Sequence, residues 1–259
     1  MSKNNDQAAA AAADGDQTRW NSYPRQDFVF DGRAGVLVSP ACVAEGKPWV
    51  WRTEYFGAFA QADLAMLAHG WHLAYYNVSE LFGGNRCVEI MGRFHCYLKA
   101  IHGFTALPAL FGFSRGGFSA FNYAARFPGK VGLLYLDAPL LDLRSLAVMK
   151  AAASPAEGFQ ALLEKYPSFS AEAFDDVPLN AMDQIGQVAA AGVPILLVAG
   201  DADEVVPYEE NGAVLARRYP PCGGTIEVIL KPACGHHPHS LENPEPIVNF
   251  ILASAPPRR

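Results

Sequence analysis

Ser114 has the setting that most clearly indicates covalent chemistry. It is the centre of Gly112-Phe113-Ser114-Arg115-Gly116, a G-x-S-x-G pattern between a short apolar segment and an amphipathic one. A strand that turns sharply into a helix lifts the central serine above the edge of a sheet, and glycines on both sides leave room for the turn. The helix then directs its first N–H groups toward any oxyanion formed there. The pattern therefore predicts a nucleophile.

A serine hydroxyl needs a base within hydrogen-bonding reach, and that base needs an acid that orients it. Two loops further along the chain supply these groups. Asp201 and Asp203 are the candidate acids, and His236, His237 and His239 are the candidate bases. Each loop follows a predicted strand, so all these side chains are expected at the carboxyl edge of one sheet.

The closely spaced histidines also raise the question of a metal site, because neighbouring imidazoles can share an ion. Pro238 interrupts the helix on which such a pair of ligands usually lies, and no cysteine or glutamate pattern converges on the loop. The sequence therefore predicts no metal, and nothing in it indicates another cofactor.

Composition narrows the class of protein. The chain has 259 residues, 51% of them hydrophobic, and a formal net charge of −6 without a basic cluster. This argues against nucleic acid or an anionic membrane as the main partner. The 5 cysteines are scattered and lack C-x-x-C spacing, which favours reduced thiols and a cytoplasmic location. No apolar run approaches the length that spans a membrane.

Strands alternate with helices along most of the chain. Residues 1–19, with their alanine run, are predicted to be a disordered tail before a single domain over residues 20–259. Strands are expected at residues 27–30, 34–39, 72–78, 131–136, 194–199 and 225–230 and just before Ser114, and the segment 46–57 is expected to be a loop. Such alternation predicts a doubly wound α/β fold with a mostly parallel sheet. Residues 142–181 are expected to form a small helical lid.

The segments GFSRGG, AGDADEVVP and GHHPH together resemble those of α/β-hydrolases. This resemblance covers nearly all of the chain after the tail. It implies that Ser114 is the nucleophile, Asp203 the acid and His236 the base. Asp201 is then a residue that orders the turn, and Asp137, which ends an earlier strand, is the alternative acid.

The resemblance also implies an oxyanion hole. One donor is expected to be the backbone N–H of Arg115. The second is expected in the loop after the strand at 34–39, near Ala41 or Cys42. This chain lacks the H-G-G-G run that supplies the donor in lipases, so the second donor is left open.

Substrate contacts are expected from the aromatic and charged segment 46–57. Trp51 would stack on the substrate, and Arg52, Glu54 and His237 would hold its polar groups. The alternative is that the aromatic residues of this segment only pack against the helix that follows.

The resulting prediction is a serine hydrolase that cleaves an ester of a small polar or carbohydrate-like molecule through an acyl-enzyme. The alternatives are a peptidase of the same fold and a receptor that keeps the pocket without catalysis. The expected partner is the small-molecule ester itself. No oligomeric state is predicted.

Overall fold

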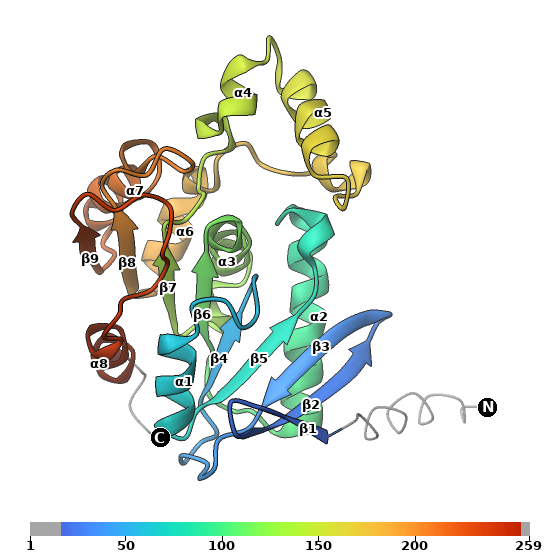
Figure 1. Ribbon diagram of the computed structural model, residues 1–259, viewed down its shortest axis with the longest axis vertical. Helices are drawn as coiled ribbons and strands as arrows, with labels where there is room; N and C mark the ends of the chain where they lie inside the picture. The colour runs from blue at the N-terminus through green and yellow to red at the C-terminus, as the bar shows by residue number, and fades with distance from the viewer. Residues whose placement is uncertain (1–16, 255–259) are drawn as a thin grey trace.

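The computed structural model describes residues 17–254. They form one nine-stranded sheet with flanking helices, and its strand order is β1-β2-β3-β5-β4-β6-β7-β8-β9 (Figure 1). The strands are β1 (Gln17–Trp20), β2 (Tyr23–Phe30), β3 (Arg33–Val38), β4 (Trp49–Arg52), β5 (His72–Tyr76), β6 (Ala109–Phe113), β7 (Leu133–Asp137), β8 (Ile195–Gly200) and β9 (Ile226–Lys231). All neighbours from β5 across to β9 pair in parallel, whereas β1, β2 and β3 form an antiparallel edge that joins β5. The predicted mostly parallel α/β sheet is confirmed.

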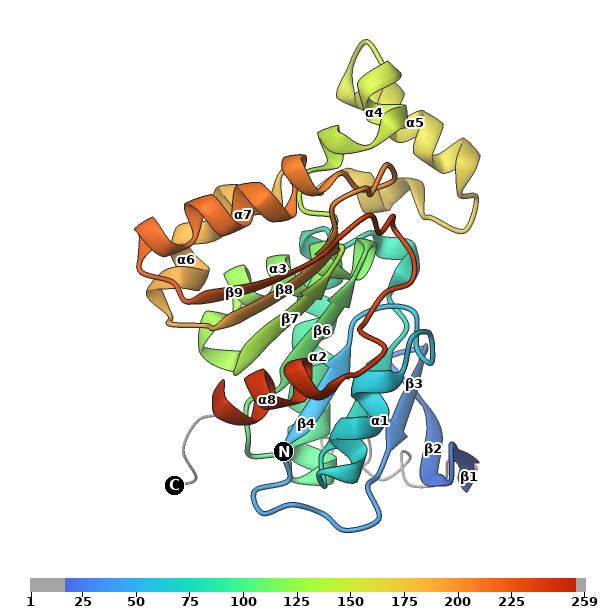
Figure 2. The same ribbon diagram turned by 60° about the vertical axis from the view of Figure 1, so that its left-hand side comes forward.

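Helices cover both faces of this sheet, as Figure 2 shows. They are α1 (Gln61–Ala68), α2 (Asn85–His102), α3 (Arg115–Arg126), α4 (Ala147–Ala151), α5 (Pro155–Lys165), α6 (Ile185–Ala190), α7 (Gly212–Arg218) and α8 (Glu245–Ser254). Neighbouring side chains of β6 show the two layers, since Leu110 packs with α2 and α3 while Phe111 packs with α1 and α8. Every residue of β6, β7 and β8 is buried, as expected for parallel strands covered on both sides.

The amino-terminal edge of the sheet corrects the predicted tail. Residues 1–16 lie outside the described residues, but residues 17–19 belong to β1, so the tail prediction is wrong for them. Asn21 and Ser22 join β1 to β2 with φ values of 46° and 67°, which suits a two-residue hairpin of the type I′ class. The Trp20 ring lies 5.2 Å from the Phe56 ring, which fixes β1 against the domain.

The largest correction concerns the middle of the sheet. Residues 46–57 were expected to form a loop, yet Trp49–Arg52 is β4, a fully buried strand between β5 and β6. The segment predicted as a strand at 34–39 is β3, which runs antiparallel to β5. As a result, the loop after β4, and not the loop after β3, is the one beside Ser114.

An insertion between β7 and α6 holds α4 and α5, which stand over the carboxyl edge of the parallel strands (Figure 1). Asp142 and Asn180 form an isolated β-bridge at its base. The segment 142–181 lies within this insertion, and its role as a lid stays a prediction. Phe82, which follows β5, holds the insertion down through ring contacts of 4.9 Å with Phe169 and 5.2 Å with Phe174. Within residues 17–254, no helix has both the length and the apolar character needed to cross a membrane.

Candidate active site

Ser114 occupies the sharp turn between β6 and α3. Its backbone has φ 50° and ψ −122°, a combination that a non-glycine residue adopts only under constraint from its surroundings. The glycines around it are required by space. A Cβ on Gly112 would lie 2.8 Å from the Cα of Gly117, and one on Gly116 would lie 2.9 Å from the Cβ of Glu54. The turn therefore holds the serine hydroxyl above the sheet edge.

The structure brings Ser114, His236 and Asp203 together in one chain of hydrogen bonds. The Ser114 Oγ lies 2.9 Å from the His236 Nε2, and the His236 Nδ1 lies 2.7 Å from the Asp203 Oδ2. A carboxylate only accepts, so Nδ1 carries the hydrogen and Nε2 is left to accept the proton of the serine. Loops that are 122 and 33 residues apart in the sequence thus meet at one edge of the sheet.

Asp203 is held in the ionised form that this arrangement needs. Burial alone would raise the pKa of its carboxyl group, but hydrogen bonds from His236 and from the backbone N–H groups of Val206 and Val205 outweigh burial and lower the pKa. Both N–H groups donate to Oδ1 at 2.9 Å, while Oδ2 accepts from His236. The acid is therefore oriented by its own loop, and at neutral pH it can stabilise a positively charged imidazole.

A second pair of the same kind lies beside the first. The His239 Nδ1 is 2.9 Å from the Asp137 Oδ1, and the other oxygen of Asp137 accepts from the Tyr135 hydroxyl at 2.7 Å and from the Ser240 N–H at 2.8 Å. Asp137, the alternative acid, thus serves a different histidine. Asp201 is exposed and does not reach either ring.

Arg115 directly follows Ser114 in the structure, and the role of its backbone N–H in an oxyanion hole stays a prediction. It is the first residue of α3, so its N–H has no acceptor within the helix and remains available beside Ser114. Ala41 and Cys42 are wrong as sources of the second donor. Because β3 runs antiparallel, their loop lies at the opposite edge of the sheet, where a Cβ on Gly70 would meet the Cys42 carbonyl at 2.8 Å.

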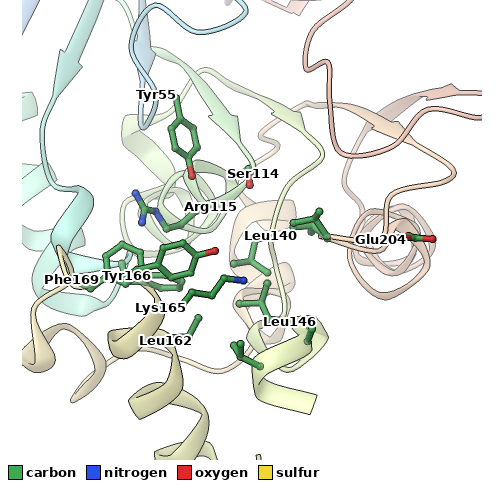
Figure 3. A pocket seen from close by; sticks show the side chains of 15 residues that line it. Tyr55, Ser114, Arg115, Leu140, Leu146, Leu162, Lys165, Tyr166, Phe169 and Glu204 are labelled. Atoms are coloured by element: carbon green, nitrogen blue, oxygen red, sulfur yellow. The ribbon is translucent and has the colours of Figure 1, made fainter. Parts of the chain in front are cut away.

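Tyr55, in the loop after β4, lies next to Ser114, although the sequence indicated it only as one of the aromatic residues that could stack on a substrate. Burial raises the pKa of its phenol, although Arg115 and a hydrogen bond with the Ser114 side chain act to lower it. The phenol thus stays protonated and can donate. Figure 3 shows its oxygen directed toward Arg115 and Ser114. Recognising Trp49–Arg52 as a strand would have identified this loop, because the parallel neighbour of β6 must end beside the serine.

The prediction that Trp51 and Arg52 bind substrate is wrong, because both belong to the fully buried strand β4. Trp51 is 1% exposed, and its ring packs against those of Trp49 and Tyr123. Arg52 is 0% exposed, and its Nη1 lies 3.3 Å from the Asp63 carboxylate. Both side chains support the sheet from inside.

Glu54 is also buried, with one oxygen 3.2 Å from the Arg115 Nη2 and the other accepting from the Ser79 hydroxyl at 2.5 Å. It does not line the cavity, so direct substrate contact is wrong for this residue. His237 is exposed, and its ring stacks on Phe59 at 5.5 Å. Its contact with substrate stays a prediction.

A cavity of about 310 Å³ opens beside Ser114, between the sheet edge and the insertion (Figure 3). Its wall is mainly apolar, made by Phe82, Leu140, Leu146, Ala147, Val148, Leu162, Phe169, Val205 and Val206. Its polar residues are Tyr55, Ser114, Arg115, Lys165, Tyr166 and Glu204. A small molecule with an apolar body can lie here with its reacting carbonyl at the serine.

The histidine loop also answers the question of a metal site. His236, His237 and His239 each offer a nitrogen, and these atoms lie within 4.8 Å of one another. Both ring nitrogens of His236 and one of His239 already have hydrogen-bond partners. A metal ion bound by all three residues would have to displace Ser114 or Asp203 from His236.

No protein-family model matches this chain, and no curated protein matches it either. Solved structures do match. The chain covers 98% of the esterase Est1E from Butyrivibrio proteoclasticus, with 89% of its own length aligned, 19% identity and a TM-score of 0.60. It also covers 98% of a carboxyl esterase from Bacillus coagulans, with 88% of its own length aligned, 15% identity and a TM-score of 0.61.

Peptidases share this architecture too. An acylaminoacyl peptidase from Pyrococcus horikoshii aligns with 92% of this chain at 12% identity and a TM-score of 0.68. The chain spans only 42% of that peptidase, and only 34% of a dipeptidyl peptidase 4 from Porphyromonas gingivalis. At these identities what is shared is the fold, and this chain has the α/β-hydrolase fold.

Proposed function

We propose that this protein is a serine hydrolase that cleaves a carboxylic ester through an acyl-enzyme. The observation that carries the proposal is the unbroken series of hydrogen bonds from the Ser114 Oγ through His236 to Asp203 at the mouth of a cavity. A hydroxyl, a base and an orienting acid in this geometry are the groups that nucleophilic acyl transfer requires.

In the first half of the reaction, the Ser114 Oγ attacks the carbonyl carbon as its proton passes to the His236 Nε2. Asp203, hydrogen-bonded to Nδ1 at 2.7 Å, stabilises the imidazolium. The oxyanion accepts from the Arg115 N–H and the Tyr55 hydroxyl. As the tetrahedral intermediate collapses, His236 returns the proton to the alcohol oxygen, the alcohol leaves and an acyl-serine remains.

The second half repeats these steps with water. His236 takes a proton from a water molecule whose oxygen attacks the acyl carbon. The carboxylic acid then leaves as the proton returns to the Ser114 Oγ. Each group ends as it began, so the enzyme turns over without a cofactor.

An ester is favoured over a peptide with a free amino terminus by the charges at the cavity. Such a peptide needs a carboxylate to pair with its ammonium group. Glu204 points away from the cavity in Figure 3, and Glu54 is engaged with Arg115. The cationic residues Arg115 and Lys165 would instead repel an ammonium group. The apolar wall also favours an ester with an apolar body over the carbohydrate-like ester expected from the sequence.

The test is covalent labelling followed by turnover. A fluorophosphonate should modify Ser114, located by mass spectrometry of the labelled peptide, and p-nitrophenyl esters should give a burst of p-nitrophenol. Both signals should vanish in Ser114→Ala, whose melting temperature shows that it is folded. Anilides of the same acyl groups distinguish a peptidase. A chain that is neither labelled nor active on any of these compounds would instead be a binding protein.

Tyr55→Phe tests the second oxyanion donor. Loss of one donor lowers kcat by about 10²-fold to 10³-fold in hydrolases of this kind, and most of the effect should fall on kcat because the bond strengthens only as charge develops on the oxygen. Unchanged kcat in Tyr55→Phe would assign the second donor to a backbone N–H of the loop after β4.

A further inference from the structure

The cavity beside Ser114 contains two cationic side chains in different situations. The Arg115 guanidinium lies 3.2 Å from the Glu54 carboxylate and 4.5 Å from the centre of the Phe169 ring. Its charge is therefore already balanced, and its place is fixed. Lys165, the last residue of α5, has no carboxylate partner among the residues whose side chains the structure describes, 18–171 and 174–254. Its Nζ lies 5.4 Å from the centre of the Tyr166 ring.

The Lys165 ammonium group is directed so that it can bind a group inside the cavity. In Figure 3 the Lys165 Nζ and the Tyr166 hydroxyl both point toward the middle of the cavity, where Ser114 faces them from the sheet edge. Glu204, the acidic residue among those that line the cavity, points outward. Two donors thus converge on a space whose other walls are mainly apolar, and no carboxylate of the residues that line the cavity faces them.

We infer that this cavity selects esters whose apolar body ends in an anionic group, with a carboxylate as the simplest case. The anionic group is held by the Lys165 ammonium and the Tyr166 hydroxyl at the insertion, while the ester carbonyl lies at Ser114. The inference rests on the proposed function. A cavity of about 310 Å³ suits a molecule of this size, since pockets for small ligands begin near 300 Å³.

The exposure of the Lys165 ammonium group determines how strong the preference for an anionic ester can be. Lys165 is exposed, so its attraction for a carboxylate is that of a partly solvated pair. Such pairs contribute up to about fivefold in affinity at low salt and less as salt is added. The preference for an anionic ester is therefore expected to be moderate and to weaken at high ionic strength.

Matched substrates test this directly. Mono-p-nitrophenyl adipate and p-nitrophenyl hexanoate have acyl chains of the same length, and only the first ends in a carboxylate. p-Nitrophenyl 6-aminohexanoate places an ammonium group there instead. We expect kcat/KM to be highest for the adipate, about twofold to fivefold above the hexanoate, and lowest for the amine. A second arm compares 4-acetoxybenzoate with 4-methylphenyl acetate, which moves the carboxylate to the alcohol portion.

Lys165→Met should remove the preference for the anionic ester in whichever arm shows it, and about 0.5 M NaCl should reduce it in the wild type. Lys150→Met is the matched control. Lys150 belongs to α4 of the same insertion, but it pairs with Glu210 at 2.5 Å and does not line the cavity. The ratio of the two kcat/KM values should be the same in Lys150→Met as in the wild type.

Two kinds of failure are distinguishable. The inference is overturned if neither anionic ester exceeds its neutral partner, or if Lys165→Met leaves the ratio unchanged, while Ser114 still reacts with fluorophosphonate and the neutral ester is still hydrolysed. The proposed function itself fails if Ser114 is not labelled and no ester in either arm is hydrolysed.

Discussion

Two aspartate–histidine pairs lie side by side at the carboxyl edge of the sheet, and only one of them contacts Ser114, the proposed nucleophile. Asp203–His236 and Asp137–His239 have nearly equal N–O distances, 2.7 Å and 2.9 Å, and their imidazole centres are 4.9 Å apart. His236 contacts the Ser114 Oγ. The His239 ring instead lies against Phe113, 5.4 Å away, and Phe59, 5.3 Å away.

The two pairs have the same chemical groups but differ in the residues that they contact next. Asp137 ends β7 and also binds Tyr135 and Ser240, so the second pair fastens the histidine loop to the sheet. His239 is 4% exposed and thus has little access to substrate. In the proposed reaction the first pair moves a proton, whereas the second pair holds the loop that carries His236.

The largest difference is expected between the two histidines. His236→Gln removes the base, and in serine hydrolases such a loss lowers kcat by about 10⁴-fold to 10⁶-fold. His239→Gln keeps a polar side chain on the buried Asp137 and should lower kcat by no more than about tenfold, because only the position of the loop is affected. Burst kinetics with a p-nitrophenyl ester measure both. Equal losses would mean that His239 takes part in proton transfer.

Substitution of the two aspartates should also give different results, with the larger loss of kcat at Asp203. Asp203→Asn replaces an acceptor with a group that can hold the wrong tautomer of His236, a change that costs about 10⁴-fold in kcat. Asp137→Asn should act mainly on stability, lowering the free energy of unfolding by about 1–3 kcal/mol because buried hydrogen bonds to a charged group are weakened. Urea unfolding and kcat are measured on both variants. A larger loss of kcat in Asp137→Asn would reverse the assignment of the acid.

Short motifs after predicted strands were sufficient to predict Ser114 and to place the acid and the base in two loops. The resemblance to α/β-hydrolases then selected Asp203 and His236. The chain order of these motifs indicated one sheet edge. The structure places the three side chains together without any change to those residues. The choice of Asp203 over Asp201 came from the G-x-x-D pattern of α/β-hydrolases. In the structure Asp203 contacts His236, whereas Asp201 is exposed.

The oxyanion loop and the substrate contacts could not be predicted because they depend on which strands are neighbours. The four residues of β4 look like part of an aromatic loop, although Trp and Val favour strands. Their pairing partners in β5 and β6 are distant in sequence. Once β4 was missed, β3 took its place, and the second donor was assigned to Ala41 and Cys42 at the wrong edge. The buried contact between Arg52 and Asp63 is equally a product of folding.

Adding one methyl group at Gly200 should disturb the Asp203–His236 pair and leave the Asp137–His239 pair in place. A Cβ on Gly200 would lie 2.1 Å from the Cys234 carbonyl and 2.6 Å from the Gly235 carbonyl, so Gly200→Ala must push back the backbone that carries His236. A displacement of this kind costs about 10²-fold in rate. Gly186→Ala is the control, since nothing lies within 4 Å of its Cβ in α6, and it should stabilise the helix by up to about 1 kcal/mol.

The smallest expected effect is the contribution of Asp203 to acid stability. Its pKa is lower in the folded protein because the hydrogen bonds from His236 and Val206 outweigh burial. A carboxylate whose pKa falls on folding stabilises the protein above its unfolded pKa of about 3.9, and this contribution is lost as the pH falls through the folded value. The free energy of unfolding should therefore fall more between about pH 5 and pH 2 in the wild type than in Asp203→Asn. Asp201→Asn removes an exposed carboxylate from the same loop and should follow the wild type. Parallel curves for wild type and Asp203→Asn would show that the carboxylate orients His236 without contributing to folding, which would leave its role confined to the reaction.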